Sequence, residues 1–184
     1  MIPRRARRAA AAAAAALFLA GAAAALFGPS VGLFSGTRPA TLGFSGGRFA
    51  PGDWRPNWVS STVPPEDAAH YVAPIAFAGD PAAAWAALEA AVAVMPRARV
   101  ASRAPGYLHV EFASKGLGFV DDAEFALDGA ARVIHAKSAA RLGIRDFSVN
   151  RDRVEAIRAA LGKGPPGRRG AGPGPGEASV NDSV

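Results

Sequence analysis

Three consecutive stretches in the second half of the chain alternate between apolar and polar residues, a pattern typical of β-strands with one face on a core. They read "YLHVEFAS" (107–114), "FVDDAEFALDG" (119–129) and "RVIHAKSA" (132–139). "SKGLG" (114–118) and "DGAA" (128–131) predict the hairpin loops that join them. A weaker strand candidate, 97–103, comes first, and "PGY" (105–107) predicts the turn that follows it. The pattern therefore predicts four antiparallel strands in succession.

A helix before these strands is predicted from its end signals. In "GDPAAAWAALEAAVAVMP" (79–96), Asp80 can cap the helix, Pro81 suits its first position, and Pro96 ends it. An apolar stripe along it should face the core, formed by Trp85, Leu88, Val92 and Met95. The short strand candidate "YVAPIAF" (71–77) precedes this helix, and its Pro74 indicates an edge or bulge position.

A second helix closes the ordered part of the chain at "NRDRVEAIRAAL" (150–161). Asn150 can cap it, and Val149 and Val154 have the spacing of a hydrophobic staple. Val154, Ile157 and Leu161 form its expected buried stripe. The elements together predict an α+β fold, an antiparallel β-sheet with two helices packed on one face, preceded by an N-terminal apolar helix.

The N-terminus carries four Arg residues and then an uncharged run from Ala9 to Gly36. The part of this run that suits a helix, 9–27, is close to the length that crosses a bilayer. An uncleaved anchor, a cleaved signal peptide and a cytoplasmic Ala-rich helix all remain open. The Arg cluster favours a cytoplasmic N-terminus, so we expect an inner-membrane protein whose domain lies outside the cytoplasm, or a periplasmic or secreted one after cleavage.

Composition then sets the expected boundaries. We predict a membrane anchor or signal segment at 1–36, an irregular connecting segment at 37–67 that is rich in Gly and Pro, and the α+β domain at 68–161. The tail, 162–184, has too much Gly and Pro and too few apolar residues to fold, so we expect it to be disordered.

Charge and cysteine content narrow the function classes. The formal net charge is +6, but between Asp53 and Leu161 the chain has 12 basic and 13 acidic residues. The basic residues in excess thus belong to the ends of the chain, and no nucleic-acid partner is expected. The chain has no Cys, which excludes disulfides and thiolate metal sites. No Ser lies in the strand-to-helix turn that exposes a catalytic hydroxyl.

The alternating strands place six chemistry-bearing residues on one face of the sheet. We call them the polar face: His109, Glu111, Asp122, Glu124, His135 and Lys137. The expected register sets Glu111 opposite Asp122 and His109 opposite Glu124 in the first hairpin. In the second it sets Leu127 opposite Arg132, so that His135 faces Glu124 and Lys137 faces Asp122. A solvated ladder of ion pairs explains this face, and a divalent-metal site at His109, Glu124 and His135 is the less favoured reading.

A second group of polar residues surrounds the turn into the last helix. It comprises Asp121, Ser138, Arg141, Asp146, Asn150, Arg151 and Arg153. They fit either a buried network that caps the helix or an anion site in which Arg141, Arg145 and Arg151 grip a phosphate or carboxylate. Asp121 points toward the apolar side, so we expect Ser138 or Arg141 to bond it and Asp121→Ala to destabilise more than Asp122→Ala.

Several motifs in this order resemble the bacterial and plastid family called domain of unknown function 1499. They are "RPNWVSS" (55–61), Pro74–Ile75, "FVDDAEF" (119–125) and "SAARLGIRDFSVNRDRVEAIR" (138–158), and the resemblance runs from about Leu42 to Leu161. It implies a domain without an established activity that is often exported or tied to a membrane. The family often has Cys where this chain has Gly52 and Trp58, and the loss of both implies that those two Cys pair with each other.

The sequence as a whole favours a membrane-associated envelope domain without catalytic activity that binds a partner protein or small ligand. The membrane would be contacted through the N-terminal segment, and no cofactor is expected unless the divalent metal binds. One alternative is a metal- or acid/base-dependent hydrolase that uses the polar face. Another is a domain that binds a lipid or an apolar ligand between helix and sheet.

Overall fold

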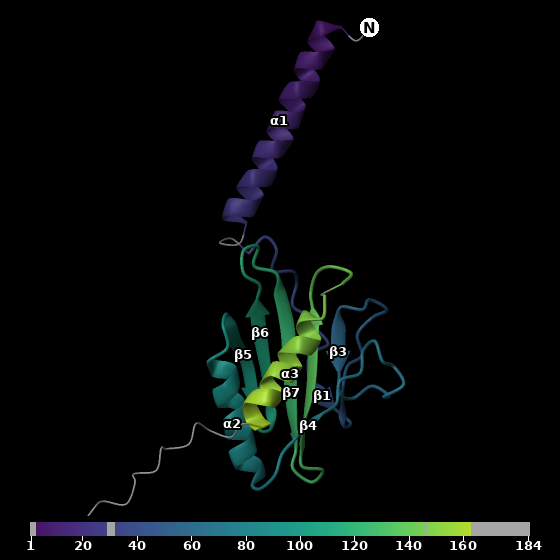
Figure 1. Ribbon diagram of the computed structural model, residues 1–184, viewed down its shortest axis with the longest axis vertical. Coiled ribbons are helices and arrows are strands. Elements are labelled where there is room, and N and C mark those ends of the chain that lie inside the picture. The colour runs from purple at the N-terminus through teal and green to yellow at the C-terminus, as the bar shows by residue number, and fades with distance from the viewer. Residues whose placement is uncertain (1–2, 29–31, 146, 163–184) are drawn as a thin grey trace, which may run out of the picture.

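The computed structural model describes residues 3–28, 32–145 and 147–162, and its centre is an antiparallel sheet (Figure 1). Four strands form a meander: β5 (Ala98–Ala104), β6 (Tyr107–Ala113), β7 (Val120–Asp128) and β8 (Val133–Ala140). β3 (Trp58–Ser60) extends the sheet beyond β8, which gives the order β3-β8-β7-β6-β5. The two-residue β4 (Ile75–Ala76) pairs with the start of β8. The predicted α+β fold is confirmed.

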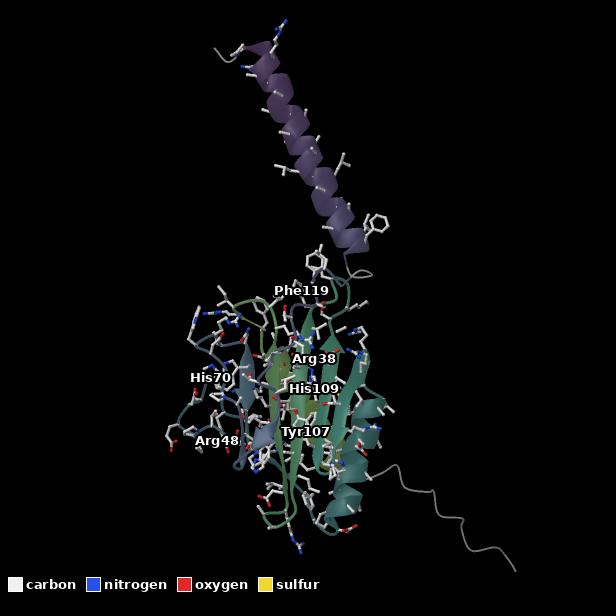
Figure 2. The ribbon with its side chains drawn as sticks, turned by 180° about the vertical axis from the view of Figure 1, so that it is seen from behind. Arg38, Arg48, His70, Tyr107, His109 and Phe119 are labelled. Carbon is white, nitrogen blue, oxygen red and sulfur yellow. The ribbon has the colours of Figure 1, made fainter. Side chains whose placement is uncertain are left out.

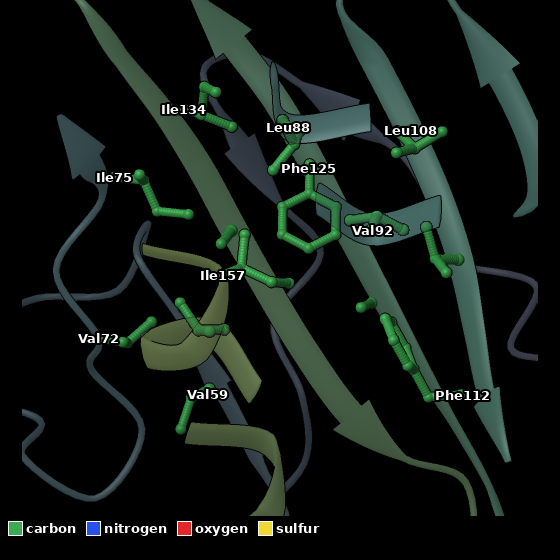
Figure 3. Close-up of a cluster of buried hydrophobic side chains, with 14 residues drawn as sticks. Val59, Val72, Ile75, Leu88, Val92, Leu108, Phe112, Phe125, Ile134 and Ile157 are labelled. Carbon is green, nitrogen blue, oxygen red and sulfur yellow. The ribbon is translucent and has the colours of Figure 1, made fainter. Parts of the chain in front are cut away.

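Two helices, α2 (Pro81–Ala93) and α3 (Val149–Gly162), cover one face of this sheet (Figure 1). The core lies between them and the strands (Figure 3). Its most deeply buried large side chains include Leu88, Leu108, Phe125, Ile134 and Ile157, each no more than 1% exposed. Burying a side chain of this size contributes about 1.5–3 kcal/mol. This apolar layer determines which face of each strand turns toward the helices.

The end signals of α2 work as predicted. The Asp80 carboxylate accepts hydrogen bonds from the backbone N–H groups of Ala82 and Ala83, and Pro81 is the first helical residue. Leu88 and Val92 are fully buried, and Trp85 and Met95 pack at the edge of the core. The predicted apolar stripe is therefore correct.

The start of α3 differs from the prediction. The helix begins at Val149, so Asn150 lies within its first turn instead of capping it. The proposed staple is wrong, because Val149 is 48% exposed and only Val154 is buried. Asn150 is itself fully buried, and its amide donates to the carbonyl oxygen of Asn57 beside β3. The buried part of the predicted stripe, Val154 and Ile157, is confirmed.

Of the two predicted hairpin registers, one is confirmed and the other is wrong. In β6–β7, Glu111 is opposite Asp122 and His109 opposite Glu124, as predicted. In β7–β8, Leu127 is opposite Ile134, so the predicted register is wrong by two residues. Glu124 consequently faces Lys137, and His135 faces Ala126. A slip of two residues keeps every side chain on its predicted face, so the hydrophobic pattern alone could not reveal the error.

The segment predicted to be an irregular connection is in fact part of the domain. Besides β3, it contains a small hairpin of β1 (Phe44–Ser45) and β2 (Arg48–Phe49). Residues 37–51, which we call the strap, lie against the sheet face opposite the helices, the face seen in Figure 2. The strand predicted at 71–77 shrinks to β4, with a single parallel bridge between Tyr71 and Ser60.

Gly52 and Trp58 lie in direct contact next to the strap. A Cβ added at Gly52 would lie 2.3–2.5 Å from atoms of the indole ring. That ring is held by a 2.9 Å hydrogen bond from Nε1 to the Asp53 carbonyl oxygen and by stacking on His70 at 4.0 Å. The ring thus fills the space that any side chain at position 52 would need.

We therefore expect Gly52→Ala to lower the free energy of unfolding by about 1–3 kcal/mol, the usual cost of overpacking. Gly162→Ala is the matched control, since nothing lies within 4 Å of a Cβ there. Thermal unfolding followed by circular dichroism compares the two. Equal melting temperatures would mean that the indole moves aside without cost.

The N-terminal apolar helix is present as α1 (Arg4–Phe27), which projects away from the domain (Figure 1). Its 24 residues span about 36 Å at 1.5 Å per residue. Leu17, Phe18 and Leu19 are each more than 60% exposed. By length and composition the helix can cross a membrane, and a signal sequence would pass the same test. The tail predicted to be disordered lies outside the described residues, apart from Gly162, which ends α3.

Candidate functional site

The polar face is buried, which corrects the expected solvated ladder. Five of its six residues are at most 6% exposed, and only His135 is intermediate; the five are His109, Glu111, Asp122, Glu124 and Lys137. The strap covers them: Arg38 bonds Glu111, the Gly43 N–H bonds Glu124, and the Ala50 carbonyl accepts from Lys137. Figure 2 shows Arg38, His109 and Tyr107 on this side of the sheet.

Arg141 is the centre of one half of this face. Its guanidinium donates two 2.7 Å hydrogen bonds to the carboxylate of Asp122 and one of 2.5 Å to Glu111. His109 Nε2 lies 2.8 Å from Asp122 Oδ1. Because the Asp122 carboxylate is ionised, it accepts this bond and Nε2 carries the proton. One arginine thus bridges two buried carboxylates.

The strap and the edge strand complete this half from outside. Arg38 Nε donates to Glu111 Oε1 at 2.8 Å, and Arg99 on β5 forms an ion pair with the other Glu111 oxygen. Burial raises the pKa of Glu111, but the hydrogen bonds from Arg38 and Arg141 outweigh it and lower the pKa to about 2. For Asp122, burial likewise opposes the bonds from Arg141 and His109, and the pKa ends below its ordinary value. The pKa of Arg141 is raised, chiefly by its hydrogen bonds to Asp122.

These lowered pKa values predict acid lability. A carboxylate whose pKa is lower in the folded than in the unfolded state stabilises the fold above its unfolded pKa, and this stability is lost as the pH falls toward the folded pKa. For Glu111 the window runs from its ordinary value of 4.5 down to about 2. We expect Glu111→Gln to lose less stability across this window than the native chain, measured by urea unfolding at each pH. Parallel pH profiles would contradict the assignment.

The other half of the face is centred on Glu124. The Tyr107 hydroxyl donates to Glu124 Oε2 at 2.7 Å, the Gly43 N–H donates to the same oxygen at 2.6 Å, and Lys137 Nζ lies 3.7 Å from Oε1. Burial and the bond to Glu124 raise the pKa of Tyr107. Burial lowers the pKa of Lys137, although Glu124 opposes the shift. Both carboxylate oxygens of Glu124 thus have a hydrogen-bond or ion-pair partner.

The predicted metal ligands do not converge. His135 bonds Ser61 at 3.3 Å and stacks on Phe44, and it is not gathered with His109 and Glu124. In the described part of the chain, the set that brings three ligand atoms within 4.8 Å of one another is His109, Glu111 and Asp122. Arg141 donates to both carboxylates of that set, so a divalent ion would have to displace its guanidinium.

Four members of the second polar group, Asp121, Ser138, Asn150 and Arg153, form a network on the helix side of the sheet. Arg153, and not Ser138 or Arg141 as predicted, bonds Asp121 at 2.6 Å. Arg153 also donates to Ser138 and Asn150, and its guanidinium lies over the Phe112 ring. These bonds join α3 to β7 and β8.

The three arginines of the proposed anion site do not share one site: Arg145 and Arg151 line a common pocket of about 370 Å³, and Arg141 lies on the other face of the sheet. Arg141 bonds the carboxylates on the opposite face, while Arg151 donates to the backbone carbonyls of Ala68, Ala69 and Tyr71. Arg145 is exposed in the loop before α3. Asp146, predicted as part of this group, lies outside the described residues. The buried network accounts for Asp121, Ser138, Asn150 and Arg153, and an anion site at Arg145 and Arg151 stays a prediction.

An open groove of about 770 Å³ lies beside the covered face, between the β1–β2 hairpin and the loop after β3. Its apolar lining consists of Leu42, Phe44, Phe49, Pro51, Val63 and Pro64. Arg48, Ser60 and Thr62 add polar groups. Arg48 is exposed, and none of the described carboxylates forms an ion pair with it. The groove can accept a ligand with an apolar body and an anionic group.

Sequence reasoning missed the residues that close the polar face. Arg38, Gly43 and Ala50 lie in a segment without hydrophobic periodicity, and their partners are 73–87 residues away in sequence. Tyr107 carried a usable signal: it lies two residues before His109 on the same strand, so alternation places it on the same face.

A family model described as "Protein of unknown function (DUF1499)" matches residues 50–161. The match starts somewhat later than the resemblance predicted from Leu42, and it includes β3 and the whole meander. No curated protein and no solved structure matches the chain. Because the family model covers more than half of the sequence, this chain belongs to the DUF1499 family.

Proposed function

We propose that the protein is a binding module of the cell envelope, without catalytic activity of its own, held to the membrane by α1. Its ligand is a small amphiphile with an apolar chain and an anionic head. The groove beside the β1–β2 hairpin carries this proposal, because it is open, mostly apolar and supplied with an exposed arginine. Ligand sites of this kind combine an apolar wall with a few polar groups that fix orientation.

The burial and ionisation of the polar-face residues favour a binding role over the hydrolase alternative. General acid/base catalysis needs a titratable group within reach of substrate, with a pKa near the working pH. His109 is 2% exposed beneath the strap, and Asp122 and Glu111 are held ionised by arginines. His109 and Asp122 are buried and bond each other, and Glu111, which borders an open pocket beside Arg99, binds the strap through Arg38.

Arg48 gives the groove its charge preference. It is on β2 at the groove lining, and its guanidinium can form a bidentate pair with a carboxylate or phosphate. The apolar contact for a short hydrocarbon chain of the ligand comes from Leu42, Phe44 and Val63. A ligand that lacked either part would lose one of the two contributions.

Octanoate is a water-soluble probe with both parts. We expect it to raise the melting temperature of the full chain in nanodiscs, because a ligand that binds only the native state stabilises it. Arg48→Glu should abolish the rise. Arg132→Glu is the control, since Arg132 is an exposed arginine in the β7–β8 turn, away from the groove. The same rise with octanol, or in Arg48→Glu, would reject the anionic ligand.

The anchor is supported by α1 and the charges before it. The helix is long enough to cross the hydrocarbon core of about 30 Å, and four Arg residues precede its apolar part. An enzyme reporter that is active only outside the cytoplasm, fused after Leu161, should be active, and carbonate should leave the protein in the membrane. A silent fusion that is well expressed would refute the orientation, and release by carbonate would indicate a cleaved signal.

A further inference from the structure

The end of the domain next to α1 carries an unusual number of exposed apolar side chains. They lie in two loops, β6–β7 (114–119) and β8–α3 (141–148): Leu117, Phe119, Leu142, Ile144 and Phe147. Ile144 is 60% and Phe147 88% exposed. Both loops leave the same end of the sheet, because Ala140 at the end of β8 pairs with Asp121 at the start of β7. We call these two loops the proximal loops.

Residues 33–36, which follow α1 closely in the chain, contact both the end of the helix and the proximal loops. The Leu33 N–H bonds the Gly28 carbonyl at 2.8 Å, just after the last residue of the helix. The Phe34 ring packs against the Phe119 ring in a tilted arrangement, with 5.6 Å between the ring centroids. Gly36 lies against Arg141 and Leu142. Figures 1 and 2 show the helix leaving the domain at this end, with Phe119 beneath it.

We propose that the proximal loops dock on the surface of the bilayer that α1 enters, with their apolar side chains at the level of the lipid headgroups. This inference rests on the anchor in the proposed function. The membrane surface is then continuous with the end of the helix, and a linker of so few residues keeps the loops beside it. An amphiphilic surface that combines large apolar and basic residues is the type that binds at this depth.

The basic residues in the proximal loops favour a particular lipid charge. Lys115 and Arg145 are exposed next to the apolar residues, and the sequence of the two loops contains one acidic residue, Asp146. Each basic residue near an anionic surface strengthens the attraction to that surface. We therefore infer a preference for membranes that contain anionic lipid. Docking would hold the domain in one orientation and direct the opposite end, with the β7–β8 turn, away from the membrane.

The absence of cysteine permits a direct test with the full chain. Leu117→Cys and Ile144→Cys, each labelled with a polarity-sensitive fluorophore, are reconstituted in vesicles of phosphatidylethanolamine and phosphatidylglycerol. Ala130→Cys, exposed in the β7–β8 turn, is the control. We expect blue-shifted emission and quenching by lipids with a shallow nitroxide at positions 117 and 144, and neither effect at position 130. Lys115→Glu combined with Arg145→Glu should reduce the quenching.

The outcomes separate this inference from the anchor. If the protein floats with vesicles but position 117 or 144 is quenched no more than position 130, the anchor stands and the docking is refuted. If the protein does not float, both are refuted. Equal quenching in phosphatidylcholine vesicles would refute the preference for anionic lipid. Unchanged melting temperatures of the labelled variants confirm that each remains folded.

Discussion

Arg141→Met should lower the free energy of unfolding by about 3–5 kcal/mol, the usual cost of removing one partner from a buried charge pair. The Arg141 side chain is 6% exposed and donates to two carboxylates that are themselves at most 8% exposed. Without the guanidinium, the buried Asp122 carboxylate would lose its arginine hydrogen bonds, while Glu111, opposite it across the strands, keeps Arg38 and Arg99. Urea unfolding followed by tryptophan fluorescence measures the loss.

Two further variants test the electrostatic explanation for Arg141. Arg103→Met removes an arginine that is 60% exposed and pairs with Glu89 at 3.3 Å, so it should cost less than about 1 kcal/mol. Adding Asp122→Asn to Arg141→Met removes the uncompensated carboxylate charge and should recover part of the stability. Without any recovery, the loss would have to come from packing and not from charge.

Asp122→Ala should destabilise the domain more than Asp121→Ala, by about 3–5 against about 1.5–3 kcal/mol. Asp122 is 2% exposed and accepts hydrogen bonds from both Arg141 and His109. Asp121 is 14% exposed at its side chain and bonds Arg153 near the start of α3. The sequence predicted the opposite ranking, because it placed Asp121 on the apolar side and Asp122 in solvent.

The comparison uses the same substitution on adjacent residues of one strand, so strand propensity and chain position are matched. Equilibrium unfolding in urea gives both values. A larger loss for Asp121→Ala would mean that the strap leaves the polar face open to water. The strap is tested independently by Arg38→Met, which removes a strap contact to Glu111 and leaves the sheet untouched.

Local chemistry predicted much of the fold from individual residues. Asp80 and Pro81 start α2 because a capping carboxylate and a fixed φ act within three residues of each other. Alternation assigned His109, Glu111 and Asp122 to one face and Phe125 to the other, since side chains along a strand must alternate. These interactions are short in sequence, so a pattern of letters is enough to read them.

Which side chains pair at the candidate site depends on contacts between residues that are distant in sequence. A slip of two residues in β7–β8 preserves both faces, so only the turn geometry of 129–132 and the packing of the whole sheet select Lys137 as the partner of Glu124. Arg153 reaches Asp121 from a helix 32 residues later. The choice between Arg153 and Arg141 depends on which face each element covers.

The sequence by itself determined the four strands of the meander with the faces of their side chains, the two packed helices and the apolar N-terminal helix, because each follows from neighbours within a few residues. Only the tertiary structure decided that the polar face is buried. The strap has no periodic pattern, and it binds Glu111, Glu124 and Lys137 across more than 70 residues of chain. The same six side chains would form a solvated ladder without that cover, and beneath it they form a neutralised interior whose charges hold the strap on the sheet.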